Sequence, residues 1–248
     1  MSGTVRTSGD RGRLGNALSG LAVAVGCVLF LGGFAWGAVE YKPYTVPTDS
    51  MTPTVKVGDR VLAQRIDGSE VRRGDVVIFQ DPAWGDMPMV KRVVGVGGDK
   101  VACCDSRGRL TVNGKGIAEP YLQKNPLTKG RASATDFTAK VPEGQLFVLG
   151  DERTNSMDSR VHLQDAEHGS VPLSTVSARV DAIAWPLGGG ALERPKAFAA
   201  LPGGVSQLGP VKLVLGSVLL GLVLILGGSA YGPLARRLGR KKAVAGVR

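Results

Sequence analysis

The sequence predicts an all-β domain, made of folded antiparallel sheets, that is anchored by two transmembrane helices, one at each end of the chain. Three observations favour this fold class. Two long apolar runs cover residues 14–39 and 212–235. Short segments rich in Val and Ile recur between turn signals in the region between these runs. No convincing amphipathic helix is found between residues 45 and 186.

The first apolar run, residues 14–39, carries no charge. A helix needs roughly 20 apolar residues to cross a hydrocarbon layer about 30 Å thick, so this run is long enough. A cleaved signal peptide is the competing interpretation, because Arg6, Arg11 and Arg13 precede the run. The apolar core is longer than the roughly 7–15 residues of signal peptides, and Trp36 stands near its outer end like an interface anchor. We therefore expect an uncleaved anchor.

The basic residues at both ends predict the topology. The second apolar run is followed by RRLGRKKAVAGVR, and cytoplasmic flanks of membrane helices are enriched in Lys and Arg. We therefore expect a multi-pass protein of the plasma membrane with both termini in the cytoplasm. The predicted organisation is a cytoplasmic segment at 1–13, a transmembrane helix at 14–39, an extracytoplasmic domain at 40–187, a linker at 188–211, a transmembrane helix at 212–235 and a basic cytoplasmic tail at 236–248.

The two ends also explain most of the net charge of +10. Residues 1–13 hold three Arg and one Asp, which gives +2, and residues 236–248 hold six basic residues and no acid, which gives +6. The central domain is therefore nearly neutral. A basic tail beside a membrane span is typical of contact with anionic membrane lipid, and we expect no nucleic-acid partner, since that would need basic residues arranged along a phosphate backbone.

Turn chemistry divides the central region into strands. VNGKGI, residues 112–117, predicts a tight hairpin because Asn-Gly tolerates the positive φ that such turns need. The Gly- and Pro-containing stretch PLGGGALERPKAFAALPGGVSQLGP is typical of a linker to the second span. The expected strands lie in DRVLAQRI, GDVVIFQ, MVKRVVGVGG, KVACC, RLTVNGKGI, GQLFVLGD and SARVDAIAWP.

The three cysteines do not indicate a metal site. Cys27 lies inside the first apolar run, whereas Cys103 and Cys104 are adjacent in the external domain. The adjacent pair forms either a strained disulfide or two free thiols on opposite faces of a strand. With no Cys-x-x-Cys pair and only His162 and His168 in the chain, we expect neither a zinc site nor a cofactor.

The stretch VPTDSMTPT places Ser50 between Pro47 and Pro53, directly after the first membrane run. A serine hydroxyl becomes a useful nucleophile only with a base in hydrogen-bond reach. Lys91 is a candidate base, because in a strand it would share an apolar face with Met89 and Val93, and burial favours its neutral form. The residues alone leave open a turn-forming Ser, a Lys that reaches solvent, or His162 acting as the base.

Several ordered blocks in residues 40–187 resemble the type I signal peptidases, membrane-anchored serine proteases that remove signal peptides from exported proteins. VPTDSMTPTVKVGD is similar to the nucleophile block of that family, RRGDVVIF to the block that follows it, KRVVGVGGD to the lysine block, and GDERTNSMDSR to the last catalytic block. VNGKGIAEPYL and VPLSTVSARVDAIAWP also have counterparts in the family. The resemblance implies a serine endopeptidase whose catalytic domain is residues 40–187.

The resemblance also implies individual roles. Ser50 would be the nucleophile and Lys91 its general base, Ser156 would orient the lysine, and Thr48 would help the Ser50 amide form an oxyanion hole. Glu152 stands where the family pattern has Asn, so a hydrogen bond that the amide would donate is in doubt, although we expect activity to persist. Shallow pockets would select small side chains at positions −1 and −3, the Ala-x-Ala pattern. Their expected lining is Val46, Pro47, Met51, Val55, Met89 and Val90.

The expected partners are preproteins bearing signal peptides, met at the export site, and membrane lipid; the sequence does not predict an oligomeric state. Trp84, in FQDPAWGDMPM, is expected at a loop tip in the bilayer interface. Asp151, Asp158, Arg153 and Arg160 are expected to form ion pairs that hold their loop, with Arg92 as a further charge partner. The main alternative is a membrane-tethered β-domain that binds exported chains without catalysis, in which Ser50 and Lys91 would be incidental.

Overall fold

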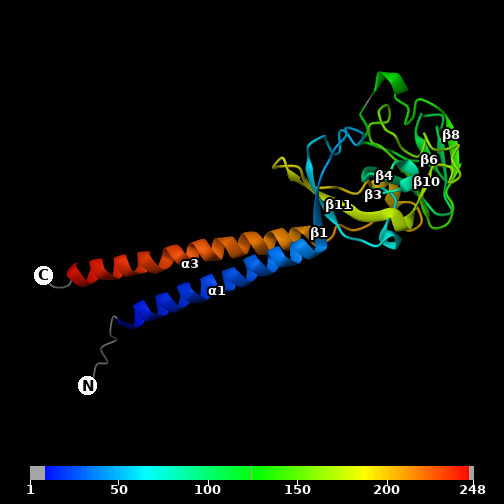
Figure 1. Cartoon of the computed structure of the whole chain (residues 1–248). Coiled ribbons are helices and arrows are strands. Elements are labelled where there is room, and N and C mark those ends of the chain that lie inside the picture. Colours follow the sequence, from blue (N-terminus) through cyan, green and yellow to red (C-terminus); the bar gives the residue numbers. More distant parts are fainter. Residues whose placement is uncertain (1–8, 124, 246–248) are drawn as a thin grey trace. The chain divides into compact units, whose positions relative to one another are not determined.

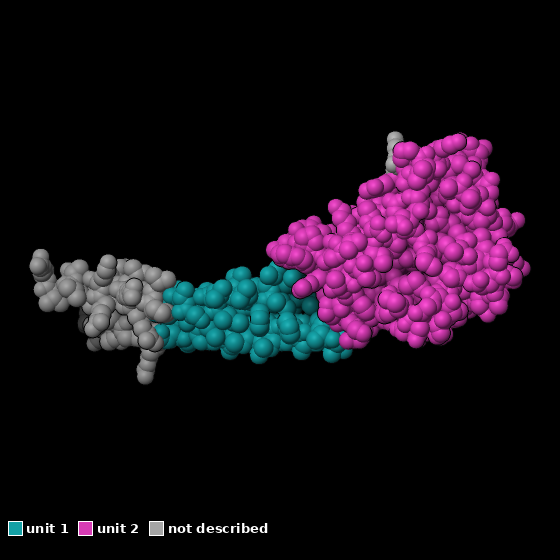
Figure 2. Space-filling view, turned by 45° about the horizontal axis from the view of Figure 1, so that its top comes forward, with its two compact units in different colours: residues 1–39, 210–248 teal, residues 40–209 magenta. Residues whose placement is uncertain are grey.

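The structure is a computed structural model that describes residues 9–123 and 125–245, and side chains within 15–123 and 125–232. The chain forms two compact units, coloured separately in Figure 2. One unit combines residues 1–39 with 210–248, and the other is the continuous segment Glu40–Gly209. The β-rich unit is therefore inserted in the sequence between the two halves of the helical unit.

The helical unit consists of α1 (Gly9–Glu40) and α3 (Val211–Ala245), which run antiparallel side by side (Figure 1). Stretches 15–40 and 211–232 within them are long and apolar enough to cross a membrane. Small residues allow the helices to approach closely. A Cβ at Gly26 would lie 2.8 Å from the Gly221 carbonyl oxygen, and the Ser19 hydroxyl donates to the Gly228 carbonyl at 2.6 Å.

The β-rich unit contains two antiparallel sheets. The larger sheet has the strand order β1-β2-β11-β3-β4-β9-β10, with β12 paired to β11, and the smaller has the order β7-β6-β5-β8. The strands of the larger sheet are β1 (Tyr41–Thr45), β2 (Arg60–Gln64), β3 (Val76–Phe79), β4 (Met89–Val96), β9 (Gln145–Leu149), β10 (Ser170–Pro172), β11 (Val176–Trp185) and β12 (Gly190–Ala191). Those of the smaller sheet are β5 (Lys100–Cys103), β6 (Leu110–Val112), β7 (Lys115–Gly116) and β8 (Phe137–Lys140).

Apart from these strands, the described part of the β-rich unit contains only one-turn helices. They are η1 (Gly68–Glu70), η2 (Pro82–Trp84), η3 (Pro126–Thr128), η4 (Leu173–Thr175) and α2 (Lys196–Ala199). The hairpin expected at Asn-Gly is present between β6 and β7, with φ of 52° at Asn113 and 78° at Gly114. The predicted fold class, an all-β domain with two apolar helices, is confirmed.

Residues 188–211 were expected to form a linker, and the structure buries two apolar side chains of this stretch, Phe198 and Leu201, in a core cluster of the β-rich unit. Phe198 is fully buried, and Leu201 is nearly so. Asp181 of β11 accepts hydrogen bonds from the Tyr41 hydroxyl and the Gly209 amide, and it also pairs with Arg194. One buried carboxylate therefore holds the first and last residues of the β-rich unit. The Gly and Pro content did not predict this burial, because these residues indicate local turns and carry no information on how the segment packs.

Candidate active site

Ser50 lies in a tight turn that follows β1. The Thr52 amide donates to the Asp49 carbonyl at 2.8 Å, and the Val55 amide donates to the Met51 carbonyl at 3.0 Å. The Ser50 carbonyl accepts the Glu152 amide at 3.0 Å, which ties the turn to the loop after β9. Ser50 is 6% exposed, so this hydroxyl is held in a defined and largely dry position.

Lys91 projects from β4, the strand adjacent to β3 and β9 in the larger sheet, and its ammonium group is 2.9 Å from the Ser50 hydroxyl oxygen. The side chain is buried, and Met89 and Val93, on its face of the strand, belong to one apolar cluster. Burial lowers the pKa of Lys91, and the negative charge of Asp158 partly offsets this by raising it. The sequence-derived pair is thus within hydrogen-bond distance in an environment that favours a neutral amine.

Thr48 and Ser156, the two residues expected to assist this pair, differ in their contacts with it. The Thr48 hydroxyl oxygen is 3.2 Å from the Ser50 hydroxyl oxygen. The Ser156 hydroxyl oxygen is buried and has no hydrogen-bond partner of good geometry among the described residues, Lys91 included. It is nevertheless near enough to Asp158 to contribute to the lowered pKa of that carboxyl, after burial, which raises it, and Arg160, which lowers it.

Gly150 lies close to both Ser50 and Ser156. A Cβ at this position would lie 2.5 Å from the Ser50 carbonyl oxygen and 2.5 Å from the Ser156 Cβ, and closer still to the Ser156 hydroxyl oxygen. Only a residue without a side chain leaves room for both neighbours at their observed positions. Its amide donates to Asp158 at 2.9 Å, so the same residue also fixes the carboxylate that acts on Lys91.

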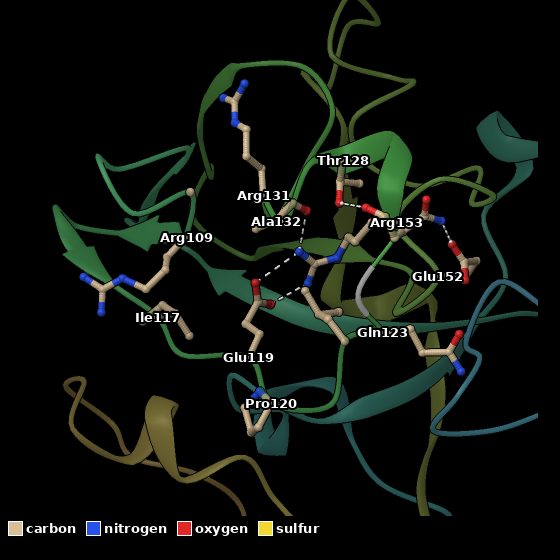
Figure 3. A pocket seen from close by; sticks show the side chains of 14 residues that line it. Arg109, Ile117, Glu119, Pro120, Gln123, Thr128, Arg131, Ala132, Glu152 and Arg153 are labelled. Carbon is tan, nitrogen blue, oxygen red and sulfur yellow. Dashed lines mark hydrogen bonds and ion pairs between the residues drawn. The ribbon is translucent and has the colours of Figure 1, made fainter.

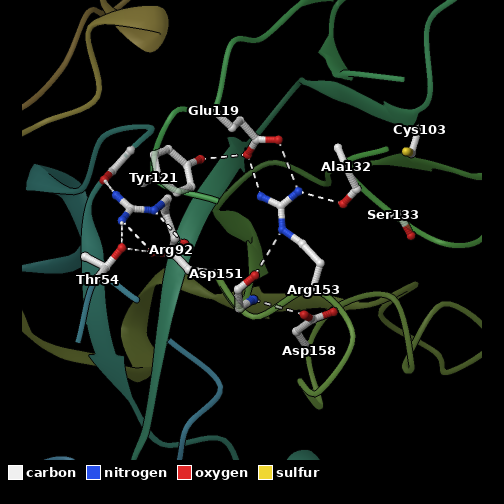
Figure 4. Close-up of polar contacts among 12 residues, drawn as sticks. Thr54, Arg92, Cys103, Glu119, Tyr121, Ala132, Ser133, Asp151, Arg153 and Asp158 are labelled. Atoms are coloured by element: carbon white, nitrogen blue, oxygen red, sulfur yellow. Dashed lines mark hydrogen bonds and ion pairs between the residues drawn. The ribbon is translucent and has the colours of Figure 1, made fainter. Parts of the chain in front are cut away.

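A buried network of charges includes Arg92, the residue that follows Lys91 (Figure 4). Arg92, the residue after Lys91, donates to both oxygens of Asp151 at 2.8 and 2.7 Å, and both side chains are almost completely buried. Thr54, from the Ser50 turn, donates to the same carboxylate at 2.5 Å. The lysine strand, the serine turn and the loop after β9 are therefore joined through Asp151.

The network continues through Glu119. Arg153 pairs with Glu119 and donates to the Gly150 carbonyl at 3.0 Å. Tyr121 donates to Glu119 at 2.6 Å, and its ring lies beneath the Arg92 guanidinium at 4.0 Å. The ion pairs expected for the loop residues are present, because Arg160 binds Asp158 through two nitrogens at 2.8 Å.

Glu152, which stands where the family pattern has Asn, acts as a hydrogen-bond acceptor in this structure. Its carboxylate accepts hydrogen bonds from the Thr154 hydroxyl at 2.5 Å and, at 3.5 Å, from Asn125, the residue that caps η3. That activity persists with Glu at this position stays a prediction. Figure 3 shows a hollow of about 300 Å³ lined in part by Glu152, with the Glu119–Arg153 pair at its side.

The six residues expected to line the specificity pockets do not form one group. Val46, Met51, Val55 and Val90 are buried in a single apolar cluster. Met89 packs at the edge of a different cluster on the other face of β4, and Pro47 is exposed. Alternation along β4 separates Met89 from Val90, so at most one of them can share a face with Val46. The pocket assignment remains a prediction.

Three further expectations concern residues outside the pair. His162 stacks on Trp84 with ring centroids 4.2 Å apart, and its Nδ1 is 2.7 Å from Asp165. No contact joins it to Ser50 among the described residues. Trp84 also packs edge-on against Phe79 and is half-buried, whereas Met87 of the same loop is 68% exposed. Cys103 and Cys104 form a disulfide.

Sequence reasoning missed the contributions of Gly150, Glu119 and Tyr121. Gly150 stood within a recognised block, and the signal that could have identified its role is a Gly followed by a buried acid. Glu119 and Tyr121 are about 30 residues away from Lys91 and Arg153 in the sequence, and only the folding of one sheet against the other brings them together.

Comparisons with known proteins identify relatives of the chain. Residues 17–185 match the family described as signal peptidase, peptidase S26. The chain is 32% identical over 199 residues to a probable signal peptidase I of Mycobacterium leprae, covering 58% of this chain and 68% of that protein. It is 36% identical to a signal peptidase I of Bacillus caldolyticus, covering 59% and 80%. For the signal peptidase I of Mycobacterium tuberculosis the match spans 65% of the relative's length.

Among solved structures, a signal peptidase I from Enterococcus faecalis is similar to this chain. The two are 29% identical, and the superposition covers 44% of this chain and 94% of that one, with a TM-score of 0.35.

Proposed function

The chain belongs to the signal peptidase family, peptidase S26, and we propose that it removes signal peptides from exported preproteins with Ser50 as nucleophile and Lys91 as general base. The observation that carries this proposal is the 2.9 Å separation between the Lys91 amine and the Ser50 hydroxyl, with both groups buried. An exposed lysine at the same distance would remain protonated near neutral pH, whereas a desolvated one has a lowered pKa.

The reaction begins when the neutral Lys91 amine takes the proton from Ser50. The Ser50 oxygen attacks the carbonyl carbon that precedes the scissile bond, and a tetrahedral intermediate forms. Lys91 then gives its proton to the departing nitrogen, which releases the mature protein and leaves the signal peptide esterified to Ser50. Water, deprotonated by the same amine, hydrolyses this ester and restores the serine.

Negative charge on the carbonyl oxygen needs donors that are already in place. We assign this role to the Ser50 amide and the Thr48 hydroxyl. The 3.2 Å separation between the Thr48 and Ser50 hydroxyl oxygens supports the assignment, because a donor beside the attacking oxygen is also beside the carbonyl that it attacks. One such donor is worth roughly 10²–10³ in rate. We assign Ser156 a positioning role through its contact with Gly150, since it makes no hydrogen bond to Lys91.

Cleavage is proposed to follow Ala-x-Ala-like sequences. The apolar cluster that contains Val46, Met51, Val55 and Val90 supports this specificity, because Met51 directly follows Ser50 and apolar surroundings favour small uncharged side chains next to the cut. We further propose that α1 and α3 anchor the enzyme in the plasma membrane with the β-rich unit outside the cytoplasm. Their length and apolar character support this placement.

Purified full-length protein in detergent tests the proposal. Cleavage of a preprotein with an Ala-x-Ala site is compared between the wild type, Ser50→Ala and Lys91→Met. Ser174→Ala and Lys115→Ala serve as matched controls, because both side chains are exposed and outside the site. We expect the first two variants to lose cleavage while remaining folded, and the controls to retain it. Retained cleavage in either Ser50→Ala or Lys91→Met would remove that residue from the mechanism.

A further inference from the structure

A second hollow, of about 370 Å³, lies beside Ser156. None of the residues that line it is among those expected to contact the signal peptide. We refer to it as the Ser156 hollow. Pockets that bind small ligands usually have volumes of about 300–1,000 Å³, so its size suits a short stretch of extended chain. Its lining residues are Leu127, Ser133, Ala134, Thr135, Arg153, Thr154, Ser156, Arg160 and Val161.

Both arginines in the wall of the Ser156 hollow are already paired with protein acceptors. Arg153 uses its guanidinium nitrogens on Glu119, the Gly150 carbonyl and the Ala132 carbonyl. Arg160 uses its own on Asp158, the Arg153 carbonyl and, more weakly, the Ser133 hydroxyl. A charged group entering the hollow would therefore find both cations already paired.

The rim is apolar. Leu127 is 75% exposed and Val161 is 59% exposed, and both line the same hollow. Single exposed apolar residues are ordinary on protein surfaces. Two of them facing one hollow, whose wall also includes a residue of the catalytic neighbourhood, provide an apolar contact surface for an uncharged side chain.

We propose that the Ser156 hollow receives the first residues of the mature protein, on the leaving side of the cut. This inference rests on the proposed function. Lys91 must deliver a proton to the departing nitrogen, so the departing chain has to pass beside the lysine. The loop that carries Gly150, Ser156 and Asp158 lies at this position, because Asp158 acts electrostatically on Lys91 and Gly150 contacts both serines.

The expected binding site of the signal peptide, on the other side of the scissile bond, also supports this inference. The residues expected to hold the signal peptide, such as Val46 and Val90, belong to a cluster of which no member lines the Ser156 hollow. The inferred substrate path runs from that cluster across Ser50 toward Ser156, because Gly150 lies against both the Ser50 carbonyl and the Ser156 side chain. The neutral wall and apolar rim then predict selection by the size of the first mature residues rather than by their charge.

Filling the hollow tests this inference. Ala134 lines it and is exposed, so Ala134→Trp adds bulk there without disturbing the core. Ala118→Trp is the matched control, because Ala118 is equally exposed and lines neither the Ser156 hollow nor the one in Figure 3. Two preproteins are compared that share one signal peptide and one Ala-x-Ala site but begin their mature region with two glycines or two leucines.

We expect Ala134→Trp to lower kcat/KM for the leucine substrate by about tenfold or more, the scale on which apolar pockets discriminate by size, and for the glycine substrate by less than about threefold. Ala118→Trp should change neither. Equal effects on both substrates, or no effect, would overturn the inference, and Thr135→Trp, at a second exposed lining position, replaces Ala134→Trp if that variant does not fold. Wild-type cleavage and its loss in Ser50→Ala test the proposed function separately, so the two can fail independently.

Discussion

At the scale of single residues, the burial of Lys91 favours catalysis but lowers the stability of the folded protein. The side chain is 4% exposed, and among the described residues its amine has two hydrogen-bond acceptors, the Ser50 hydroxyl at 2.9 Å and the Val90 carbonyl at 3.3 Å. Neither acceptor carries a charge. The protonated form is therefore poorly solvated in the folded protein, and the same lack of solvation supplies the neutral amine that the mechanism needs.

This opposition predicts the behaviour of Lys91→Met. Cleavage should fall by about 10²–10⁴, the usual contribution of a general base, while the free energy of unfolding should rise at pH 7. In the wild type the folded-state pKa is lowered, so between that pKa and the ordinary lysine value the unfolded chain binds more protons and stability increases with pH. The difference in the free energy of unfolding between Lys91→Met and the wild type should therefore narrow as the pH rises from 7 to 10. Urea unfolding at several pH values measures it, and a constant gap would contradict the prediction.

Gly150→Ala is predicted to act on geometry alone. The added methyl group collides with the Ser50 carbonyl and with Ser156, and displacement of catalytic groups by about 1 Å can cost roughly 10²-fold in rate. We expect kcat/KM to fall on that scale while Lys91 keeps its pH dependence, because alanine retains the backbone amide that holds Asp158 beside the lysine. A pH profile recorded beside the rate distinguishes this from a loss of the base. Full activity in Gly150→Ala would mean that the serines can move apart freely.

The candidate pair was predicted from the resemblance of its sequence blocks to the signal peptidases. Its local signals, Ser50 between prolines and Lys91 in an alternating strand pattern, left a turn-forming serine and a solvent-reaching lysine open. The contact of Gly150 with both serines could not be predicted, since it depends on how closely two loops approach. The division of Met89 and Val90 between opposite faces of β4 follows from alternation alone, and the six-residue pocket assignment did not apply that rule.

At the scale of secondary-structure elements, the Arg92–Asp151 pair joins β4 to the loop after β9, and Thr54 adds the serine turn. Asp151→Ala would leave the Arg92 guanidinium buried without its counter-ion, which typically costs about 3–5 kcal/mol. The matched control is Asp136→Ala, which removes the exposed pair with Arg131 and should cost less than about 1 kcal/mol. Thermal unfolding compares the two, and similar losses would show that the buried network does not hold these elements together.

The elements were predicted where turn chemistry is specific and missed where packing is long-range. Asn113 and Gly114 specify their hairpin because both adopt positive φ. The stretch 188–211 contains the same kinds of residues, yet it is fixed by Asp181 and by burial of Phe198. Turn residues show where a chain changes direction, but the depth at which the turning segment lies depends on apolar residues between the turns and on partners distant in sequence.

At the scale of the whole molecule, charge and hydropathy predict a topology that can be measured. Nine basic residues lie in 1–13 and 236–248, outside the apolar stretches, whereas the flanks on the other side of those stretches hold fewer, namely Lys42, Lys56, Arg194, Lys196 and Lys212. This asymmetry favours cytoplasmic termini. An epitope tag placed after Arg248 should therefore resist protease added to intact spheroplasts, while the β-rich unit is digested. After permeabilisation the tag should be lost as well. Digestion of the tag in intact spheroplasts would place the C-terminal tail outside the cytoplasm. It would contradict the proposal that two membrane spans hold the catalytic pair on the extracytoplasmic side.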